Sequence, residues 1–179
     1  MLYIEGYLAS SDEACKTAIR AHQIAKEESI KVALTLSDPS LVKNFRDNVK
    51  TIIGEGVDLL FCNEQEAMVW TGTTNLSSAL NQLNQTATTW ACTLGKNGAV
   101  VFDGVSKIHI PAHIVSSIDT NGAGDMFAGA FLYGLHQEWD FEKAAKFGVY
   151  TSGHLVTQYG PRLPLQNYSQ LLKVFEATE

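Results

Sequence analysis

The sequence predicts an α/β fold in which helices cover both faces of a parallel or mostly parallel sheet. Short apolar strands alternate with longer amphipathic segments along the chain, and this alternation is typical of such a sheet. Hydrophobic residues make up 45% of the 179 residues and charged residues 18%, the composition of an ordinary globular protein. The chain has no internal repeat and no low-complexity tract. Its length is that of one domain with a sizeable core.

Short apolar runs bounded by turn residues predict the strands. The expected strands are Leu2–Tyr7, Lys31–Leu36, Asp58–Cys62, Thr88–Thr93, Ala99–Phe102 and Lys107–Val115. Helical periodicity after capping residues predicts the helices, and Ser10 or Ser11 is expected to cap the first of them. The expected helices are 10–28, 40–53, 64–70, 75–85, 123–136, 140–158 and a last one opened by Pro164.

Charge and cysteine content exclude several classes of protein. A formal net charge of −6 argues against a nucleic-acid-binding surface. No apolar run approaches the roughly 20 residues that span a membrane, and the first residues lack a signal-peptide pattern. The three cysteines are widely spaced among apolar or small residues, which predicts buried, reduced thiols and a cytoplasmic protein. There is no CxxC, HExxH or Cys/His cluster, so structural zinc is not expected.

The segment Asp119–Asp125 carries the strongest chemical signal. Small residues at Gly122, Ala123 and Gly124 begin an expected helix, where free N–H groups and the helix dipole favour an anion. A carboxylate in the first turn, at Asp125, could take a proton from a hydroxyl beside that anion, as a kinase requires. The alternative is a helix whose small residues only pack against a neighbour and whose aspartate only complements the dipole. From the residues alone both interpretations stay open.

Three motifs in order resemble the PfkB family of ribokinase-like kinases. The run Asp119–Asp125 is similar to the family's second signature at every fixed position. Asn63-Glu64-Gln65-Glu66 resembles its Asn-x-x-Glu motif, and Thr93–Gly98 resembles its Thr-x-Gly-x-x-Gly nucleotide loop. The resemblance covers essentially the whole chain. It implies a ribokinase-like three-layer α/β/α fold with a mostly parallel central sheet.

The resemblance also implies ATP and Mg²⁺ as cofactors and a role for each motif. Asp125 would deprotonate the acceptor hydroxyl, and the amides of Gly122, Ala123 and Gly124 would form an anion hole for the γ-phosphate. Asn63 and Glu66 would lie near the phosphates and Mg²⁺, with Glu66 acting through ordered water. Judged by its residue type alone, Glu66 is a solvated helix carboxylate, and this alternative stays open.

Further positions are implied by the same resemblance. They are Thr93, Gly95 and Gly98 for the ribose and phosphates, Val149 and Gly153 for the adenine, and Asp119 with Gly160 for the K⁺ that many relatives bind. Lys96 is expected to contact nucleotide or to be a solvated loop tip. The histidines and tryptophans share no spacing of a ligand set, so we expect packing roles for them.

Family members are roughly twice this long, and their N-terminal half and lid, which select the acceptor, have no counterpart here. Residues 1–179 are therefore expected to be the C-terminal nucleotide-binding portion of such a kinase, inactive or weakly active alone and prone to self-association. The expected acceptor is a sugar or a nucleoside, with some preference for an adenosine-kinase-like member. The alternatives are a nucleotide-binding module without catalysis and, disfavoured by the absent GxGxxG, a Rossmann oxidoreductase.

Overall fold

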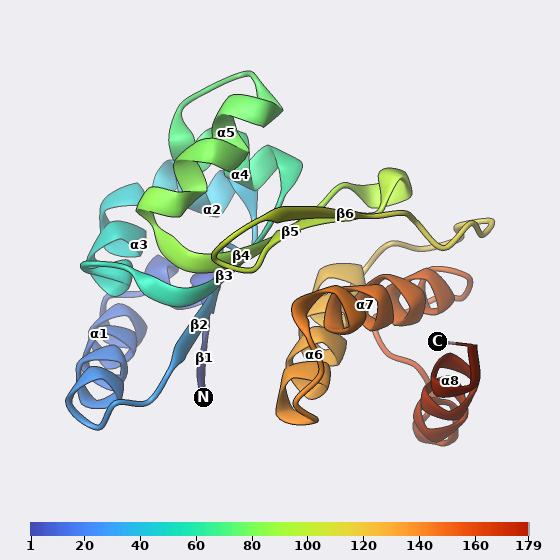
Figure 1. The fold of residues 1–179 in the computed structure, drawn as a ribbon. Helices are drawn as coiled ribbons and strands as arrows, with labels where there is room; N and C mark the ends of the chain where they lie inside the picture. The colour runs from blue at the N-terminus through green and yellow to red at the C-terminus, as the bar shows by residue number, and fades with distance from the viewer. Residues whose placement is uncertain (179) are drawn as a thin grey trace. The chain divides into compact units, whose positions relative to one another are not determined.

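The computed structural model describes residues 1–178 and confirms the alternation of strands and helices (Figure 1). The strands are β1 (Leu2–Glu5), β2 (Val32–Thr35), β3 (Val57–Asn63), β4 (Ala87–Thr93), β5 (Ala99–Phe102) and β6 (Lys107–Ile110). The helices are α1 (Asp12–Glu27), α2 (Pro39–Asn44), α3 (Arg46–Ile53), α4 (Glu64–Thr71), α5 (Leu76–Gln82), α6 (Ala123–His136), α7 (Phe141–Leu155) and α8 (Leu165–Thr178).

The sheet has six strands in the order β1-β2-β3-β4-β5-β6, and the pairings from β1 to β4 are parallel. The predicted three-layer α/β/α class with a mostly parallel sheet is therefore confirmed. Two compact units make up the chain. The first comprises Met1–Thr93 with Phe102–Ser106, and the second comprises Leu94–Val101 with Lys107–Glu179.

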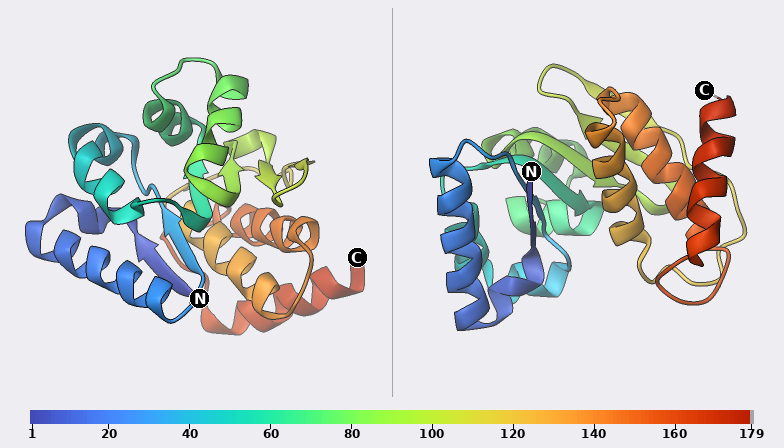
Figure 2. Two further views of the ribbon diagram at one scale, coloured as in Figure 1. Left: turned by 60° about the vertical axis from the view of Figure 1, so that its left-hand side comes forward. Right: turned by 90° about the horizontal axis from the view of Figure 1, so that it is seen from below.

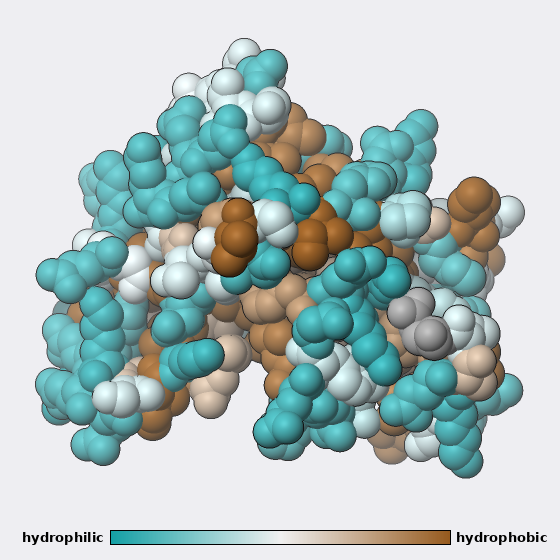
Figure 3. All heavy atoms as spheres, viewed as in Figure 1, coloured by the Kyte–Doolittle hydropathy of each residue, from teal (hydrophilic) through white to brown (hydrophobic). Residues whose placement is uncertain are grey.

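Helix α1 shows why the first unit folds as predicted. Its buried residues, Cys15, Ala18, His22 and Ala25, recur at helical spacing and form one apolar stripe. His22 Nδ1 lies 2.7 Å from the carbonyl oxygen of Ile52, which links α1 to α3. The two helices lie side by side in Figure 1 and Figure 2. Figure 3 shows mainly hydrophilic residues over their outer side.

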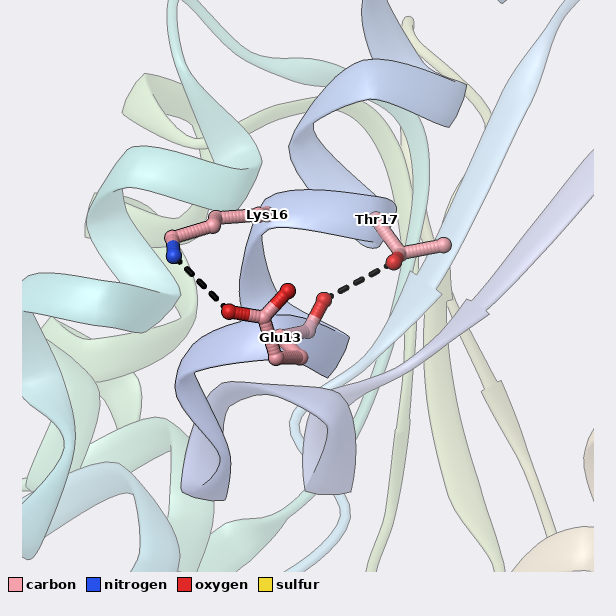
Figure 4. Close-up of polar contacts among 3 residues, drawn as sticks. All are labelled: Glu13, Lys16 and Thr17. Atoms are coloured by element: carbon pink, nitrogen blue, oxygen red, sulfur yellow. Dashed lines mark hydrogen bonds and ion pairs between the residues drawn. The ribbon is translucent and has the colours of Figure 1, made fainter.

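The start of α1 departs from the expected capping. Ser11 is the N-cap residue, but its side chain makes no capping hydrogen bond, and Ser10 Oγ donates to the carbonyl oxygen of Tyr7 instead. The first turn is held by other polar contacts (Figure 4). Lys16 Nζ lies 2.9 Å from Glu13 Oε1, and Thr17 Oγ1 donates to the carbonyl oxygen of Glu13 at 2.8 Å. These contacts are exposed, so each adds little stability.

The single helix expected over 40–53 is wrong, because the chain forms α2 and α3 with a break at Phe45. Phe45 has φ −120° and ψ 30°, outside the helical region, and directly precedes Arg46. The Arg46 guanidinium donates to the carbonyl oxygens of Val69 and Trp70 at the C-terminus of α4. It also lies 5.1 Å from the Trp70 ring centroid. These tertiary contacts favour the break over a continuous helix.

Glycine and proline set where two of the expected strands end. Strand β1 stops at Glu5, because the chain enters a 3₁₀ segment over Gly6–Ser10, and a Cβ at Gly6 would lie 2.5 Å from the carbonyl oxygen of Thr35. Strand β6 stops at Ile110, since Pro111 has no N–H to continue a ladder. Both strands are therefore shorter than the apolar runs suggest. Among the described residues, no helix has the length and apolar character needed to cross a membrane.

The second unit is built on the close packing of α6 against α7. A Cβ at Gly134 of α6 would lie 2.9 Å from the Ala144 Cβ of α7, so the glycine allows the two helices to approach. An aromatic cluster extends this contact to α8. Trp139 stacks on Phe175 with ring centroids 5.8 Å apart, and Phe147 lies 5.0 Å from the same ring.

Candidate active site

Asn63 and Glu66 form a reciprocal capping box at the start of α4, where β3 ends. Asn63 Oδ1 accepts from the amide of Glu66 at 2.8 Å. In return the Asn63 amide donates to Glu66 Oε2 at 2.9 Å, and Asn63 Nδ2 donates to Oε1 at 2.6 Å. The Asn-x-x-Glu motif therefore has a structural purpose in itself, since this spacing is that of a helix-starting box.

The alternative of a solvated Glu66 carboxylate is wrong, because only 4% of the residue is exposed. Burial raises the pKa of the Glu66 carboxyl to about 7, and the negative charge of Asp38 adds to the rise while the hydrogen bond from the Asn63 amide opposes it. Asp38, the N-cap of α2, was not singled out by sequence reasoning. The available signal was its place just after β2, since polar residues there lie at the ligand-binding edge of a parallel sheet.

Thr93 lies beside Asn63 at the same sheet edge. The two residues are Cα partners at the ends of the parallel strands β3 and β4. The structure thus brings together three of the predicted site residues within the first unit, namely Asn63, Glu66 and Thr93.

Gly95 and Gly98 bound a one-turn 3₁₀ segment after β4, and both have positive φ, +55° and +86°. The Leu94 amide donates to the carbonyl oxygen of Gly98 at 2.7 Å and closes the turn. A Cβ at Gly98 would lie 2.0 Å from the carbonyl oxygen of Ile110, so the chain's own backbone requires glycine there. Gly95 has no atom within 4 Å of its Cβ position, which leaves open space beside it.

The loop before α6 is held by Asp119. Its Oδ1 accepts from the Asn121 amide at 2.9 Å, and its Oδ2 accepts from the Gly160 amide at 2.9 Å. These two bonds, that from Gly160 first, lower the pKa of the Asp119 carboxyl. Asp119 and Gly160, both predicted as cation-site residues, are therefore neighbours, and a hydrogen bond joins them.

Gly122 and Gly124 differ sharply in their surroundings. Gly122 has φ +77°, and a Cβ on it would lie 2.5 Å from the carbonyl oxygen of Pro161. Gly124 is exposed, with nothing within 4 Å of its Cβ position. Between them, the Ala123 amide already donates to the carbonyl oxygen of Thr120 at 3.2 Å. The open backbone at Gly124 is the part of the predicted anion hole that a phosphate could approach freely.

Asp125 follows in the first turn of α6, and its side chain is exposed. The next turn is buried, since Phe127 and Phe131 pack with ring centroids 5.9 Å apart. The apolar face of α6 is therefore packed in the interior, while Gly124 and Asp125 at its N-terminal end are exposed to solvent.

Val149 and Gly153, the predicted adenine contacts, lie one turn apart on α7. Val149 is buried, and the Gly153 Cβ position lies 2.9 Å from the Cβ of His113. The His113 ring packs edge-on against Tyr150, with centroids 5.1 Å apart. Sequence reasoning gave His113 no role beyond packing, and nothing in its spacing signals this contact with Gly153.

The described residues contain no group of three or more His, Cys, Asp or Glu side chains placed to hold a metal ion. Glu66 offers the nearest fit to Mg²⁺, but both of its oxygens already accept hydrogen bonds from Asn63. Such a carboxylate suits an ion that keeps its waters and is bound through them.

Comparisons with known proteins agree with the motifs. The family model described as pfkB family carbohydrate kinase matches residues 1–167. The ribokinase of Haemophilus influenzae is 31% identical over 163 residues, which cover 87% of this chain and 51% of the relative. The adenosine kinase of Saccharomyces cerevisiae is 28% identical over 183 residues, covering 94% of this chain and 53% of the relative.

Solved structures show the same fold. A probable sugar kinase from Rhizobium etli superposes with a TM-score of 0.88 at 34% identity, over 96% of this chain and 52% of the other. The chain spans about half the length of the curated relatives it matches. The strand order, the three motifs and these matches together show that the chain belongs to the PfkB family of carbohydrate kinases.

Proposed function

We propose that this chain is the nucleotide-binding portion of an ATP-dependent kinase that phosphorylates a hydroxyl of a sugar or nucleoside. The observation that carries the proposal is the start of α6, where exposed Asp125 follows the open backbone of Gly124 in a chain of the PfkB family. An acidic residue directly beside free helix-terminal amides combines a proton acceptor with an anion site. The alternative, in which the small residues only pack against a neighbour, does not account for Gly124, whose Cβ position has no atom within 4 Å.

In this proposal Asp125 is the catalytic base. Its carboxylate accepts the proton of the acceptor hydroxyl as the oxygen attacks the γ-phosphorus. The amides of Gly122, Ala123 and Gly124 stabilise the charge on the transferring phosphoryl group. Gly124 is the most exposed of the three residues, and the Ala123 amide would first have to leave the carbonyl oxygen of Thr120. Positioning and electrostatic stabilisation of this kind supply most of the catalysis in phosphoryl transfer.

The remaining nucleotide contacts follow from the same motifs. Thr93 and the turn bounded by Gly95 and Gly98 would contact ribose and phosphates, and the left-handed backbone of that turn requires its glycines. Val149 and Gly153 would contact the adenine from α7. For adenine to contact Gly153, the His113 ring beside Gly153 would have to pack against the adenine or move.

Mg²⁺, when bound, would neutralise phosphate charge and orient the phosphates. Glu66 would act on it through water, because its oxygens are already engaged by Asn63. A nearby cation would also favour the ionised form of this buried carboxyl. If the site takes K⁺, Asp119 and the turn at Gly160 are its proposed holders, and the ion would share the Asp119 carboxylate with the Gly160 amide.

The acceptor class rests on relatives that act on different compounds, ribokinase and adenosine kinase. A sugar or a nucleoside is therefore proposed, and an adenosine-kinase-like acceptor remains an alternative. A second candidate function is nucleotide binding without catalysis. It is favoured by the coverage of only about half of each relative, since the part not covered would supply the acceptor pocket.

Calorimetry with MgATP and an ADP-release assay over a panel of sugars and nucleosides test these proposals together. We expect weak MgATP binding and undetectable or very slow turnover by the 179-residue chain. Robust turnover of one acceptor would refute the half-site interpretation and identify the substrate. A chain that folds but binds no nucleotide would contradict the proposed function itself.

A further inference from the structure

Cys62 and Cys92 form a buried pair on neighbouring strands of the first unit. Their Cα atoms are partners in the parallel register of β3 and β4. Residues opposed in this way project from the same face of the sheet. Both residues are free cysteines, and they are only 5% and 0% exposed.

The neighbouring Cys92 side chain is the main cause that raises the pKa of the Cys62 thiol well above its usual value, with burial as the second cause. Cys92 Sγ also lies 3.9 Å from the carbonyl oxygen of Thr93. The Cys62 thiol is therefore kept protonated, and such a thiol reacts poorly with reagents that need a thiolate. A reagent that bonds to both sulfurs gains more binding free energy here than a reagent that bonds to only one.

The surroundings restrict the kind of ligand that this pair can take. No third His, Cys, Asp or Glu joins the two sulfurs in a metal-binding group anywhere in residues 1–178. Structural zinc requires four ligands, so the pair is unsuited to zinc. A soft centre that is satisfied by two sulfurs fits it better, because sulfur ligands select soft partners.

We propose that Cys62 and Cys92 form a dithiol-binding site for trivalent organic arsenicals. An arsenoxide, R–As=O, has one organic group and accepts two sulfurs. In the reaction both S–H bonds and the As=O bond break, and two As–S bonds form. The oxygen of the arsenoxide and the two thiol protons leave together as one water molecule. No electron changes hands, so the step needs neither an oxidant nor a reductant.

Occupancy of this site has a consequence at the sheet edge. The residues that follow the two cysteines are Asn63 and Thr93, themselves Cα partners. Arsenic inserted between the sulfurs would shift the ends of both strands and with them the capping box at Glu66. On the proposed function, MgATP affinity should then fall by about fivefold or more, the lower end of usual coupling between two sites.

The test uses phenylarsine oxide on the full chain, with intact-mass measurement after prolonged incubation, since buried sulfurs are reached only through local opening. We expect one phenylarsine per chain with loss of one water, reversed by a dithiol such as dithiothreitol and not by a monothiol. Cys62→Ala and Cys92→Ala should each abolish the adduct, and Cys15→Ala, the matched control at the third buried cysteine, should keep it. An adduct that survives Cys62→Ala, or no adduct on the wild-type chain, overturns the proposal.

A second measurement needs no variant and so does not depend on the folding of one. Excess arsenical is removed, the chain is unfolded in guanidinium, and free thiols are alkylated with N-ethylmaleimide. Peptide mapping should show Cys15 alkylated and Cys62 with Cys92 protected. Protection of Cys15 would overturn the assignment of the pair. Calorimetry then separates the two proposals. If the unmodified chain binds no MgATP, the proposed function fails while the mass result stands, and equal MgATP binding before and after modification refutes the coupling alone.

Discussion

The amide of Gly160 donates to Asp119 Oδ2 at 2.9 Å across a sequence separation of 41 residues. This bond joins the loop before α6 to the turn after α7. The same carboxylate also accepts from Asn121, so a single side chain organises the approach to the candidate catalytic helix.

Asp119→Asn should lower the thermal midpoint at pH 7, because a charged acceptor of two backbone amides is replaced by a neutral one. The folded-state pKa of Asp119 lies below its ordinary value, so the carboxylate contributes stability above pH about 4 and loses it as the pH falls through the folded value. The difference between variant and wild type should therefore vanish in strong acid. Thermal unfolding of the variant and the wild type, at pH 7 and in strong acid, measures this difference. An equal effect of Asp12→Asn, an exposed first-turn aspartate of α1, would contradict this account.

Glu66 should give the opposite pH dependence. Its pKa rises from 4.5 to about 7 on folding, so the folded state holds the proton more tightly than the unfolded state. The stability associated with that proton is present below pH about 4.5 and is lost as the pH rises to about 7, up to about 3 kcal/mol. Glu66→Gln should remove this decline, so the stability of the variant relative to the wild type should increase between pH 5 and pH 8, even though its amide group can accept only one of the two hydrogen bonds from Asn63. Glu64→Gln, a change in the same turn of α4, should keep the decline of stability with rising pH. If the decline disappears in Glu64→Gln, the titrating group is not Glu66.

The same Glu66→Gln variant also tests the metal role. In a form of the protein that shows turnover, the Mg²⁺ concentration for half-maximal rate should rise, because a negative partner of the hydrated ion is lost. An unaltered Mg²⁺ profile would leave Glu66 with its capping role alone.

Asp125→Asn should leave MgATP affinity nearly unchanged and reduce turnover by about 100-fold or more, the usual scale for loss of a general base. Calorimetry gives the affinity, and the ADP-release assay gives the rate in a form of the protein that is active. Asp12→Asn serves again as the control, since it removes an exposed carboxylate from the first turn of another helix. Parallel losses of affinity and rate would make Asp125 a phosphate-site or structural residue.

Gly124→Ala and Gly129→Ala form a matched pair on α6. Both glycines have open space at the Cβ position, so alanine should fit and stabilise the helix by up to about 1 kcal/mol at each. Only Gly124 belongs to the proposed anion hole, so only Gly124→Ala should weaken MgATP binding. Equal MgATP affinities of the two variants would show that the phosphate does not bind at Gly124. Gly122→Ala, by contrast, should fail to fold properly because of its positive φ and its contact with Pro161.

The sequence predicted the fold class and the position of α6 because both depend on local pattern. Apolar runs and the small residues before Met126 carry that information within a few positions. The break at Phe45 could not be read in this way, because Arg46 satisfies carbonyl groups of a helix more than twenty residues further on. Ser11 failed as a side-chain cap although its residue type is favourable. At Phe45 a contact made elsewhere outweighed the local preference, and nothing in the structure explains why Ser11 makes no capping bond.

The candidate site likewise combines features that the sequence predicted with features that depend on tertiary contacts. The residue types of the three motifs were read from the sequence, and the family resemblance implied that Asp119 and Gly160 lie close together. The burial of Glu66 and the packing of His113 on Gly153 were not, because both arise from the assembled fold. Gly98 illustrates the difference: the resemblance implied a ribose or phosphate contact for it, and the structure adds that the carbonyl oxygen of Ile110 occupies its Cβ position.

The opposed positions of Asn63 and Thr93 have a consequence for how this chain can vary in length. The connection from α4 through α5 lies between the two strands, and residues added or lost there leave the strand pairing intact. One residue added or lost inside β3 or β4 would turn every later side chain of that strand to the other face of the sheet. It would also separate both the Asn63–Thr93 and the Cys62–Cys92 pairs. Insertions and deletions among variants of this chain should therefore fall in the connection and be absent from these two strands.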